Sequence, residues 1–440
     1  MSRRNLEITS SNHTSTGIIS FKSGNPVLQF IIGESDMTLV GSSVRLCGQF
    51  RVRGNGTTTN ALPLSASNIR MSEQLGMFSV IDQLVIKSQA THQVIEEIKN
   101  YQHFMSSYLP VTTSNNDNLT HLSQQALTLP NYQAHKLSVV DIETGLTTAA
   151  RPGNSFCIHL PCGLFNGQNP IPLAQNGNGG LGGLLVEVHL APDSQVLFGQ
   201  NGKDDEMKDA FYELSNVYMT AEAIDNDAGQ PPASSFEFNS ISSYYTTFNS
   251  ANAIINFNLG LSRVLGVFGN ITSASMINTV TANGLANNYP VNADGSVAPI
   301  NQIFFLKGGE KYPIEYNVNT IQRDDGSEKI CDAQLQQEFM NAVMKFSAIS
   351  KTSVKTTTTE LLDSKPTDAN GMNARVNGGL VVGIGCAYDV ISGNGVDFTS
   401  QNFGINMETR ITTDSPQALY LYVHSKQTLM FSANGIRVIK

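Results

Sequence analysis

The segment from Phe156 to Ile224 reads FCIHLPCGLFNGQNPIPLAQNGNGGLGGLLVEVHLAPDSQVLF, continues through a charged loop and ends in FYELSNVYMTAEAI. It contains three runs with the pattern of a β-strand, at 156–160, 184–190 and 211–223. In the last two runs apolar side chains alternate with others, which places one face of a strand on a core and the other outward. Prolines and a glycine cluster mark the connections between the runs. Strands this close, joined by loops this long, favour a two-sheet sandwich over a simple meander.

The bulk composition favours two domains with an uncharged polar surface. A chain of 440 residues is too long for one ordinary core. Charged residues make up 14% of the chain, compared with about 25% in typical domains. Asn, Ser, Thr, Gln and Gly take their place, a composition associated with all-β shell or adhesion proteins.

The charge distribution argues against a nucleic-acid-binding protein. The formal net charge is −9, whereas non-specific binding to nucleic acid needs a basic field. Arg3 and Arg4 are the only basic residues at the start of the chain, and a polar segment follows them as far as Gly17. This N-terminal stretch is interpreted either as a disordered tail or as an arm that contacts an acidic partner or a membrane.

Targeting signals and cysteine usage indicate a protein made in a reducing compartment. The N-terminus lacks the apolar core of a signal peptide, and no apolar run approaches about 18–20 residues. The cysteines are scattered and odd in number, which suits buried thiols rather than a disulfide framework. They are Cys47, Cys157, Cys162, Cys331 and Cys386.

The two halves of the chain show the same order of elements. In the first half, opening strands lead to a strand at 78–87 and an amphipathic helix at 91–108, with Thr91 as N-cap and Pro110 as terminator. After a polar excursion, the strands described above close this half. The acidic and Gly/Pro-rich stretch 225–232 is the best linker candidate. We therefore predict an N-terminal arm at 1–16 and two domains at 17–227 and 228–440.

The second half repeats this order without a residue-level repeat. Its strand candidates include 301–307 and 312–318, and a second amphipathic helix is predicted from Asp332 to about Phe346. Each half has a length that suits an eight-stranded sandwich with long loops. The fold predicted from the pattern is all-β.

The motifs that could carry catalysis or cofactor binding are weak. The letters GNGGLG at 177–182 match a dinucleotide fingerprint, but a strand follows where a helix is required, so a hairpin-type loop is favoured. Cys157, His159 and Cys162 are close in sequence, but no second Cys/His pair completes a zinc site. The chain also lacks a P-loop, a G-x-S-x-G elbow and an H-x-H pair.

Two further clusters favour structural roles. Asp204, Asp205 and Glu206 could offer oxygen ligands to calcium, but a solvated loop explains them better. The aromatic side chains at 244, 245 and 248 could form a sugar platform, yet aromatics at strand spacing are more often core. We expect no enzyme activity, no cofactor and no metal.

The whole order of elements resembles one family. FSVIDQLVIKSQATHQVIEEIKNYQHF, the closing strands of the first half, SPQALYLYVHSKQTLMF and the terminal NGIRVIK resemble the double jelly-roll major capsid proteins of tailless icosahedral DNA viruses. This group includes virophages, polinton-like viruses and membrane-containing phages. The resemblance implies two consecutive eight-stranded antiparallel jelly rolls, each with one or more flanking helices and long loops.

The resemblance also implies an assembly. Three copies would form a homotrimer that acts as a pseudo-hexameric capsomer, and capsomers would tile an icosahedral virion assembled inside the host cell. The polar loops at 54–67, 111–150, 281–300 and 352–375 would form towers or clasps between subunits. Arg3 and Arg4 would lie near the inner side, beside minor capsid or penton proteins or an internal membrane, with no sequence-specific contact to nucleic acid. The alternatives are a tandem jelly-roll glycan-binding or receptor-binding protein and a cupin-like metal enzyme.

Overall fold

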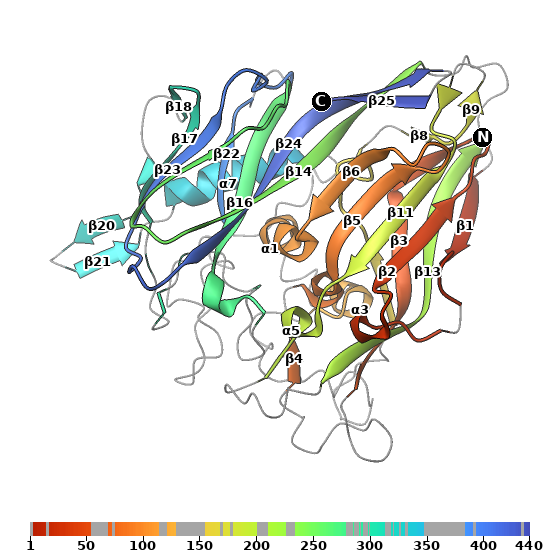
Figure 1. Cartoon of the computed structure of the whole chain (residues 1–440), viewed down its shortest axis with the longest axis horizontal. Coiled ribbons are helices and arrows are strands. Elements are labelled where there is room, and N and C mark those ends of the chain that lie inside the picture. The colour runs from red at the N-terminus through yellow and green to blue at the C-terminus, as the bar shows by residue number, and fades with distance from the viewer. Residues whose placement is uncertain are drawn as a thin grey trace.

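The structure is a computed structural model in which two β-sandwiches lie side by side (Figure 1). All structural statements concern the described residues, which are 3–14, 17–53, 69–72, 75–113, 121–128, 155–167, 170–176, 179–199, 210–225, 234–278, 285, 290, 292–293, 298, 300–312, 318–319, 321–324, 327–330, 333–346, 383–389, 393–432 and 435–440.

The first sandwich packs the sheet β1-β13-β3-β7 against the sheet β2-β11-β5-β6. All pairings within these sheets are antiparallel. The strands are β1 (Arg3–Thr9), β2 (Val27–Ile32), β3 (Met37–Arg53), β5 (Ile81–Ser88), β6 (Val94–Lys99), β7 (Ser155–His159), β11 (Leu184–Leu190) and β13 (Phe211–Asp225).

The second sandwich packs the sheet β14-β24-β16-β22 against the sheet β15-β23-β17-β18. The strands are β14 (Ser235–Phe248), β15 (Asn252–Phe257), β16 (Val264–Ser273), β17 (Ile300–Lys307), β18 (Glu310–Tyr312), β22 (Ile384–Ala387), β23 (Phe403–Thr409) and β24 (Gln417–Ser432). Short strands add to the edges or form small pairs: β4 (Ile69–Met71), β8 (Ile171–Pro172), β9 (Gln175–Asn176), β10 (Gly179–Gly180), β12 (Leu197–Gly199), β19 (Val318–Asn319), β20 (Ile321–Asp324), β21 (Ser327–Ile330) and β25 (Gly435–Ile439).

Both sandwiches follow the same chain path. When the eight main described strands of either half are counted in chain order, one sheet has the order first, eighth, third, sixth. The other sheet has the order second, seventh, fourth, fifth. Two such sheets with long cross-connections are a jelly roll. The prediction of two consecutive eight-stranded antiparallel jelly rolls is confirmed, and we call the two sandwiches roll 1 and roll 2.

Side-chain alternation explains most of the strands. In β3, Val44, Leu46, Phe50 and Val52 are buried in the core of roll 1, and the residues between them face the other side. By contrast, every residue of β16 is buried. One face of β16 packs in the core of roll 2 and the other lies against α1 and α7, so both of its faces are covered.

The first predicted helix is wrong in its first half. The structure has β6 at Val94–Lys99 and only then α1 at Tyr101–Thr112, which runs past Pro110. Asn100 has a φ of 51°, so the chain turns there from strand to helix. The pairing of β6 with β5 shifts register at Ile95, so Ile95, Glu96 and Ile98 are all buried and the strand lacks the usual alternation.

The second predicted helix is confirmed as α7 (Ala333–Phe346), whose Leu335, Phe339 and Val343 are buried. In both rolls the long helix lies in the connection between the fifth and sixth strands. The shorter helices are α3 (His121–Gln125), α5 (Asp193–Val196), η1 (Phe21–Ser23), η3 (Gly76–Val80) and η5 (Ala274–Met276).

The predictions for the chain ends and the linker are only partly tested by the structure. Arg3–Thr9 pair with β13 as an edge strand, so these residues are not a disordered tail. The opening strand predicted at 17–23 is wrong over Phe21–Ser23, which form the short helix η1. Of the strand predicted at 312–318 only the two ends are described, Tyr312 in β18 and Val318 in β19. Roll 1 ends with Asp225 and roll 2 begins with Ser235. The predicted linker, beyond Asp225, lies outside the described residues, as do most of the four polar loops.

Candidate functional site

The junction between the rolls is built around one buried carboxylate. Glu96 on β6 of roll 1 accepts hydrogen bonds from the backbone N–H groups of Gly163 (3.0 Å) and Leu164 (2.9 Å), also in roll 1. It accepts a third from Ile241 on β14 of roll 2, at 2.7 Å. These three N–H groups would otherwise be buried without partners. Glu96 therefore ties an edge strand of one roll to an edge strand of the other.

Burial raises the pKa of Glu96 to about 6, above its usual 4.5. The three backbone N–H groups and the Cys162 thiol lower it, because they favour the charged form, but they offset burial only in part. The carboxylate is thus charged at neutral pH at a cost in stability.

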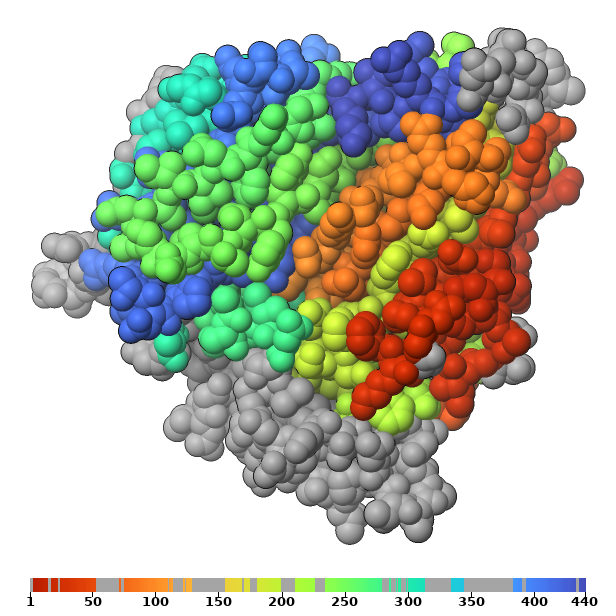
Figure 2. Space-filling model, in the orientation of Figure 1, coloured from red at the N-terminus to blue at the C-terminus, as the bar shows by residue number. Residues whose placement is uncertain are grey.

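Helix α1 lies between the rolls and is bonded to roll 2 along its length. Nδ2 of Asn270 on β16 lies 2.7 Å from the carbonyl oxygen of His103, 2.9 Å from the hydroxyl of Ser106 and 2.8 Å from that of Ser107, and these three acceptors share its two hydrogens. The His103 ring stacks on Tyr420 with centroids 3.7 Å apart. One continuous apolar cluster includes core residues of roll 1 and residues of β16, β24 and α7. The two rolls therefore share part of one hydrophobic core, and on the face seen in Figure 2 they touch directly.

The long connections leave one end of each roll. In roll 1, Gln49 near the end of β3 pairs with Ser155 at the start of β7, and Lys99 at the end of β6 pairs with Gln83 near the start of β5. The connections from third to fourth strand and from fifth to sixth strand therefore emerge together. They contain the predicted polar loops of roll 1, and the corresponding connections of roll 2 contain the other two.

The loop-bearing ends of the two rolls lie on the same side of the molecule. Gln195, on the connection from seventh to eighth strand in roll 1, donates to Asn278, which follows the third strand of roll 2 (2.5 Å). Both connections lead from an odd-numbered strand to the next even-numbered strand of their roll, so both belong to the loop-bearing end. Arg3 starts β1 at the other end of roll 1, opposite Ile224. In Figure 1 both chain termini lie at this other end, away from α5.

The predicted interaction residues Arg3 and Arg4 both form ion pairs with β13. Arg3 pairs with Glu222, and Arg4 Nε lies 3.3 Å from Asp225 Oδ1. Their side chains remain 66% and 61% exposed. Exposed pairs of this kind contribute little to stability, so both guanidinium groups remain available at the surface. Nothing in these contacts tests a role in binding a partner.

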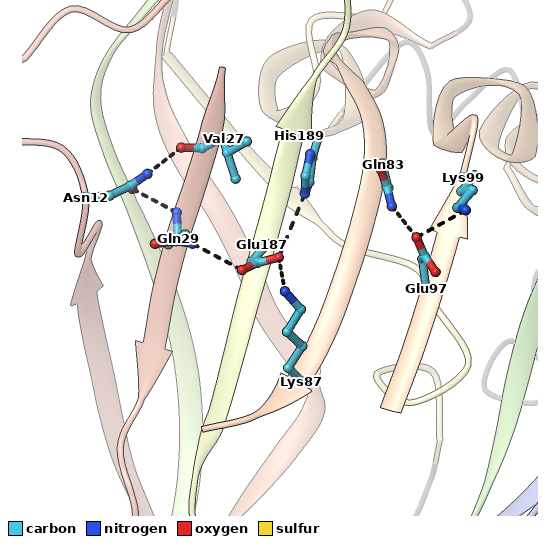
Figure 3. A network of polar contacts seen from close by, with 9 residues as sticks. All are labelled: Asn12, Val27, Gln29, Gln83, Lys87, Glu97, Lys99, Glu187 and His189. Carbon is cyan, nitrogen blue, oxygen red and sulfur yellow. Dashed lines mark hydrogen bonds and ion pairs between the residues drawn. The ribbon is translucent and has the colours of Figure 1, made fainter. Parts of the chain in front are cut away.

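The outward face of the sheet β2-β11-β5-β6 carries a polar network (Figure 3). Glu187 on β11 binds Lys87 Nζ at 2.7 Å and Gln29 Nε2 at 3.1 Å, and lies 3.9 Å from His189. Farther along the sheet, Glu97 accepts from Gln83 at 2.5 Å and lies 3.5 Å from Lys99. Charges in this network are satisfied within the chain, which suits an outer surface rather than a reactive centre.

The residues considered for metal and phosphate binding lie apart. Cys157 faces Cys47, His159 lies opposite Arg45, and Cys162 is buried beside Glu96. Burial lowers the pKa of His159 to about 4. No group of three or more His, Cys, Asp or Glu side chains within the described residues is arranged to hold a metal ion. The glycine cluster contains β10 in a small hairpin with β9, followed by β11, as the hairpin interpretation requires. The acidic residues 204–206 lie outside the described residues.

The aromatic side chains of β14 do not form a shared platform. Tyr244 and Phe248 pack against the core of roll 2, as predicted for aromatics at strand spacing. Tyr245 points to the other face, is 51% exposed and lies against Tyr420. Among the helices described here, none is both long and apolar enough to span a membrane.

Sequence reasoning missed the residues that join the rolls. The available signal for Glu96 was an acidic residue between two isoleucines, within the segment that the sequence analysis predicted as a helix. Asn270 lies in the middle of a strand whose other members are mostly apolar. Neither shows its partner in the sequence, because the partners are more than 60 residues away.

Comparison with known proteins shows the fold. No protein-family model and no curated protein sequence matches the chain. Similar solved structures include VP54 of PBCV-1 fitted into a reconstruction of the Sputnik virophage, with a TM-score of 0.55, 10% identity, and coverage of 100% of this chain and 96% of that one. A cryo-EM structure of the Sputnik virophage has a TM-score of 0.54 at 13% identity, covering 100% and 88%. The Faustovirus major capsid protein has a TM-score of 0.52 at 7% identity, covering 98% and 90%. The chain has the fold of these proteins over its whole length.

Proposed function

We propose that the chain is the major capsid protein of a tailless icosahedral DNA virus. The observation that carries this proposal is a jelly-roll path that occurs twice, in two rolls locked together by Glu96, Asn270 and α1. Three copies of a rigid two-roll unit around a threefold axis present six similar sandwiches, which gives a pseudo-hexagonal tile. The neighbours named as capsid proteins support the same function.

The polarity of the molecule suggests its orientation in a shell. The long polar connections leave one end, where they would form towers or clasps between subunits on the outer side. Arg3 and Arg4 lie at the other end, with their guanidinium groups exposed. That end would face the interior of the virion, where minor capsid proteins, penton proteins or an internal membrane would contact it. The function is assembly, so no catalytic step is assigned.

Mass determination in solution tests the trimer. The purified full-length chain should elute as a species of three chains by size-exclusion chromatography with light scattering. Negative-stain images should show particles of hexagonal outline. A stable, folded monomer at high concentration would contradict the proposal, and binding to a glycan array by such a monomer would favour a glycan-binding protein instead.

The inner-side role of Arg3 and Arg4 has a separate test. The R3A/R4A variant should form trimers as the original chain does, because exposed ion pairs contribute little to folding. When the variant and the original chain are each co-expressed with the remaining virion proteins, less of the variant should be incorporated into particles. Equal incorporation would exclude this role.

A further inference from the structure

Two of the cysteines lie directly opposite one another on neighbouring strands. Cys47 on β3 and Cys157 on β7 are partners in the antiparallel register, and their Sγ atoms are 3.0 Å apart. Both are free thiols. They lie on the side of the sheet away from the core, because Leu46 and Phe156, their neighbours in the strands, point into the core.

The backbone at this position already suits a disulfide. Residues directly opposite in an antiparallel pair have Cα atoms about 4.5 or 5.5 Å apart, depending on the hydrogen-bonding pattern. Disulfides need a Cα separation of about 4.4–6.8 Å. A bond between Cys47 and Cys157 therefore requires side-chain rotation only, with β3 and β7 keeping their register.

Cys157 has the properties of the attacking thiol. Its pKa is lowered to about 7, first because the Cys47 thiol donates a hydrogen bond to it and then because Arg45 lies near, while burial acts in the opposite direction. Cys157 is only partly buried, so a small reagent can reach it. Burial instead raises the pKa of the Cys162 and Cys386 thiols, which are almost fully enclosed. Among the four cysteines that the structure describes, only Cys157 has a lowered pKa; the pKa of its partner Cys47 is raised, first by the hydrogen bond between the two thiols and then by burial.

We propose that Cys47 and Cys157 are a thiol-oxidation site that closes to a cross-strand disulfide with a low-molecular-weight disulfide such as glutathione disulfide. The Cys157 thiolate attacks one sulfur of the reagent, forms a mixed disulfide and releases one thiolate. Cys47 then attacks the Cys157 sulfur, its proton passes to solvent, and the second thiolate of the reagent leaves. Two protein thiols are oxidised, one reagent disulfide is reduced, and the two released thiolates take up the two protons.

The disulfide would fasten the edge strand of one sheet in roll 1. Among the described strands, β7 pairs only with β3. The bond would close a loop between residues 110 positions apart. A loop of this length restricts the unfolded chain strongly. For cooperative unfolding of the whole chain, the temperature of unfolding should rise by roughly 5 °C.

Peptide mapping of the full-length protein tests the site. After incubation with excess glutathione disulfide, the expected result is a single linked peptide pair containing residues 47 and 157, together with the loss of two free thiols. Dithiothreitol should reverse both changes and the rise in unfolding temperature. The C47S variant should stop at a glutathione adduct on Cys157, and C157S should react at neither position.

Several outcomes would overturn the proposal. If the folded protein keeps both thiols after this treatment, or links Cys157 to Cys162 or to another chain, the pair is not the oxidation site. The peptide map of the treated protein with its original sequence shows which thiols react, even if a serine variant fails to fold. The result does not depend on trimer formation, so it is independent of the proposed capsid function.

Discussion

Replacing Glu96 by alanine should loosen the junction between the two rolls. The change removes the acceptor for the N–H groups of Gly163, Leu164 and Ile241 and leaves all three buried. An unsatisfied buried N–H costs about 1–3 kcal/mol, so three cost about 6 kcal/mol at the middle of that range. At neutral pH the variant is also relieved of a buried charge, which offsets about 2 kcal/mol because the pKa of Glu96 is raised from 4.5 to about 6.

The net loss in the free energy of unfolding for E96A is therefore about 4 kcal/mol at pH 7. Unfolding entropy scales with length, and for 440 residues unfolding as one unit this loss lowers the midpoint by roughly 4 °C. The measurement is thermal unfolding followed by fluorescence. E97A is the matched control, because Glu97 is the next residue of β6, faces the other side and pairs with the exposed Lys99. Its midpoint should change by less than about 1 °C.

The difference in the free energy of unfolding between the original chain and E96A should depend on pH. The folded-state pKa of Glu96 is raised, so the folded protein binds its proton more tightly than the unfolded chain does. This residue's contribution is greatest below about pH 4.5 and is lost as the pH rises through about 6. The gap between the original chain and E96A should thus be wider by about 2 kcal/mol at pH 4.5 than at pH 7. A midpoint for E96A equal to that of E97A at both pH values would refute the reasoning.

Three further substitutions probe the junction and the polar face. In G163A the new Cβ would clash with the carbonyl oxygen of Asn239 in roll 2, so the unfolding midpoint should fall by roughly 1–3 °C. The control is G167A, whose new Cβ would have its nearest contact at 3.4 Å, and it should unfold like the original chain. N270A removes the amide that serves three groups of α1 and should lower the stability measured in urea by about 2–3 kcal/mol; no change would contradict the role assigned to this amide. K87A deprives the nearly buried Glu187 of its cation and should cost about 1–2 kcal/mol by the same assay, while K99A, whose side chain is 61% exposed, should cost less than about 0.5 kcal/mol. Equal effects of K87A and K99A would show that burial does not distinguish the two pairs.

Period-two alternation made the strands of both rolls predictable. The pattern in β3 and β13 of roll 1 and in β15 of roll 2 requires strands with one face on a core, and the stripe of α7 requires a helix. The order of these elements, repeated in two halves, led to the double jelly roll. It also led to the expectation of long connections in corresponding places.

The error at β6 shows where the pattern stops being informative. The pairing of β6 with β5 shifts register at Ile95, so that Ile95, Glu96 and Ile98 are all buried, and Val94 to Lys99 then resembles one face of a helix. Only the folded chain shows why Glu96 is buried, because its hydrogen-bond partners come from both rolls, and only the reversal at Asn100 separates the strand from α1.

Alternation is a local property that each strand carries in its own residues, so the type of each roll could be predicted before the structure was known. The tertiary structure decided how the rolls are joined, that Arg3 and Arg4 lie on an edge strand, and that Cys47 faces Cys157. Those relations depend on register and docking between residues that are more than 200 positions apart in the chain. Pairing energies between such distant residues leave no periodic trace in a single sequence, so they become visible only when the strands are assembled.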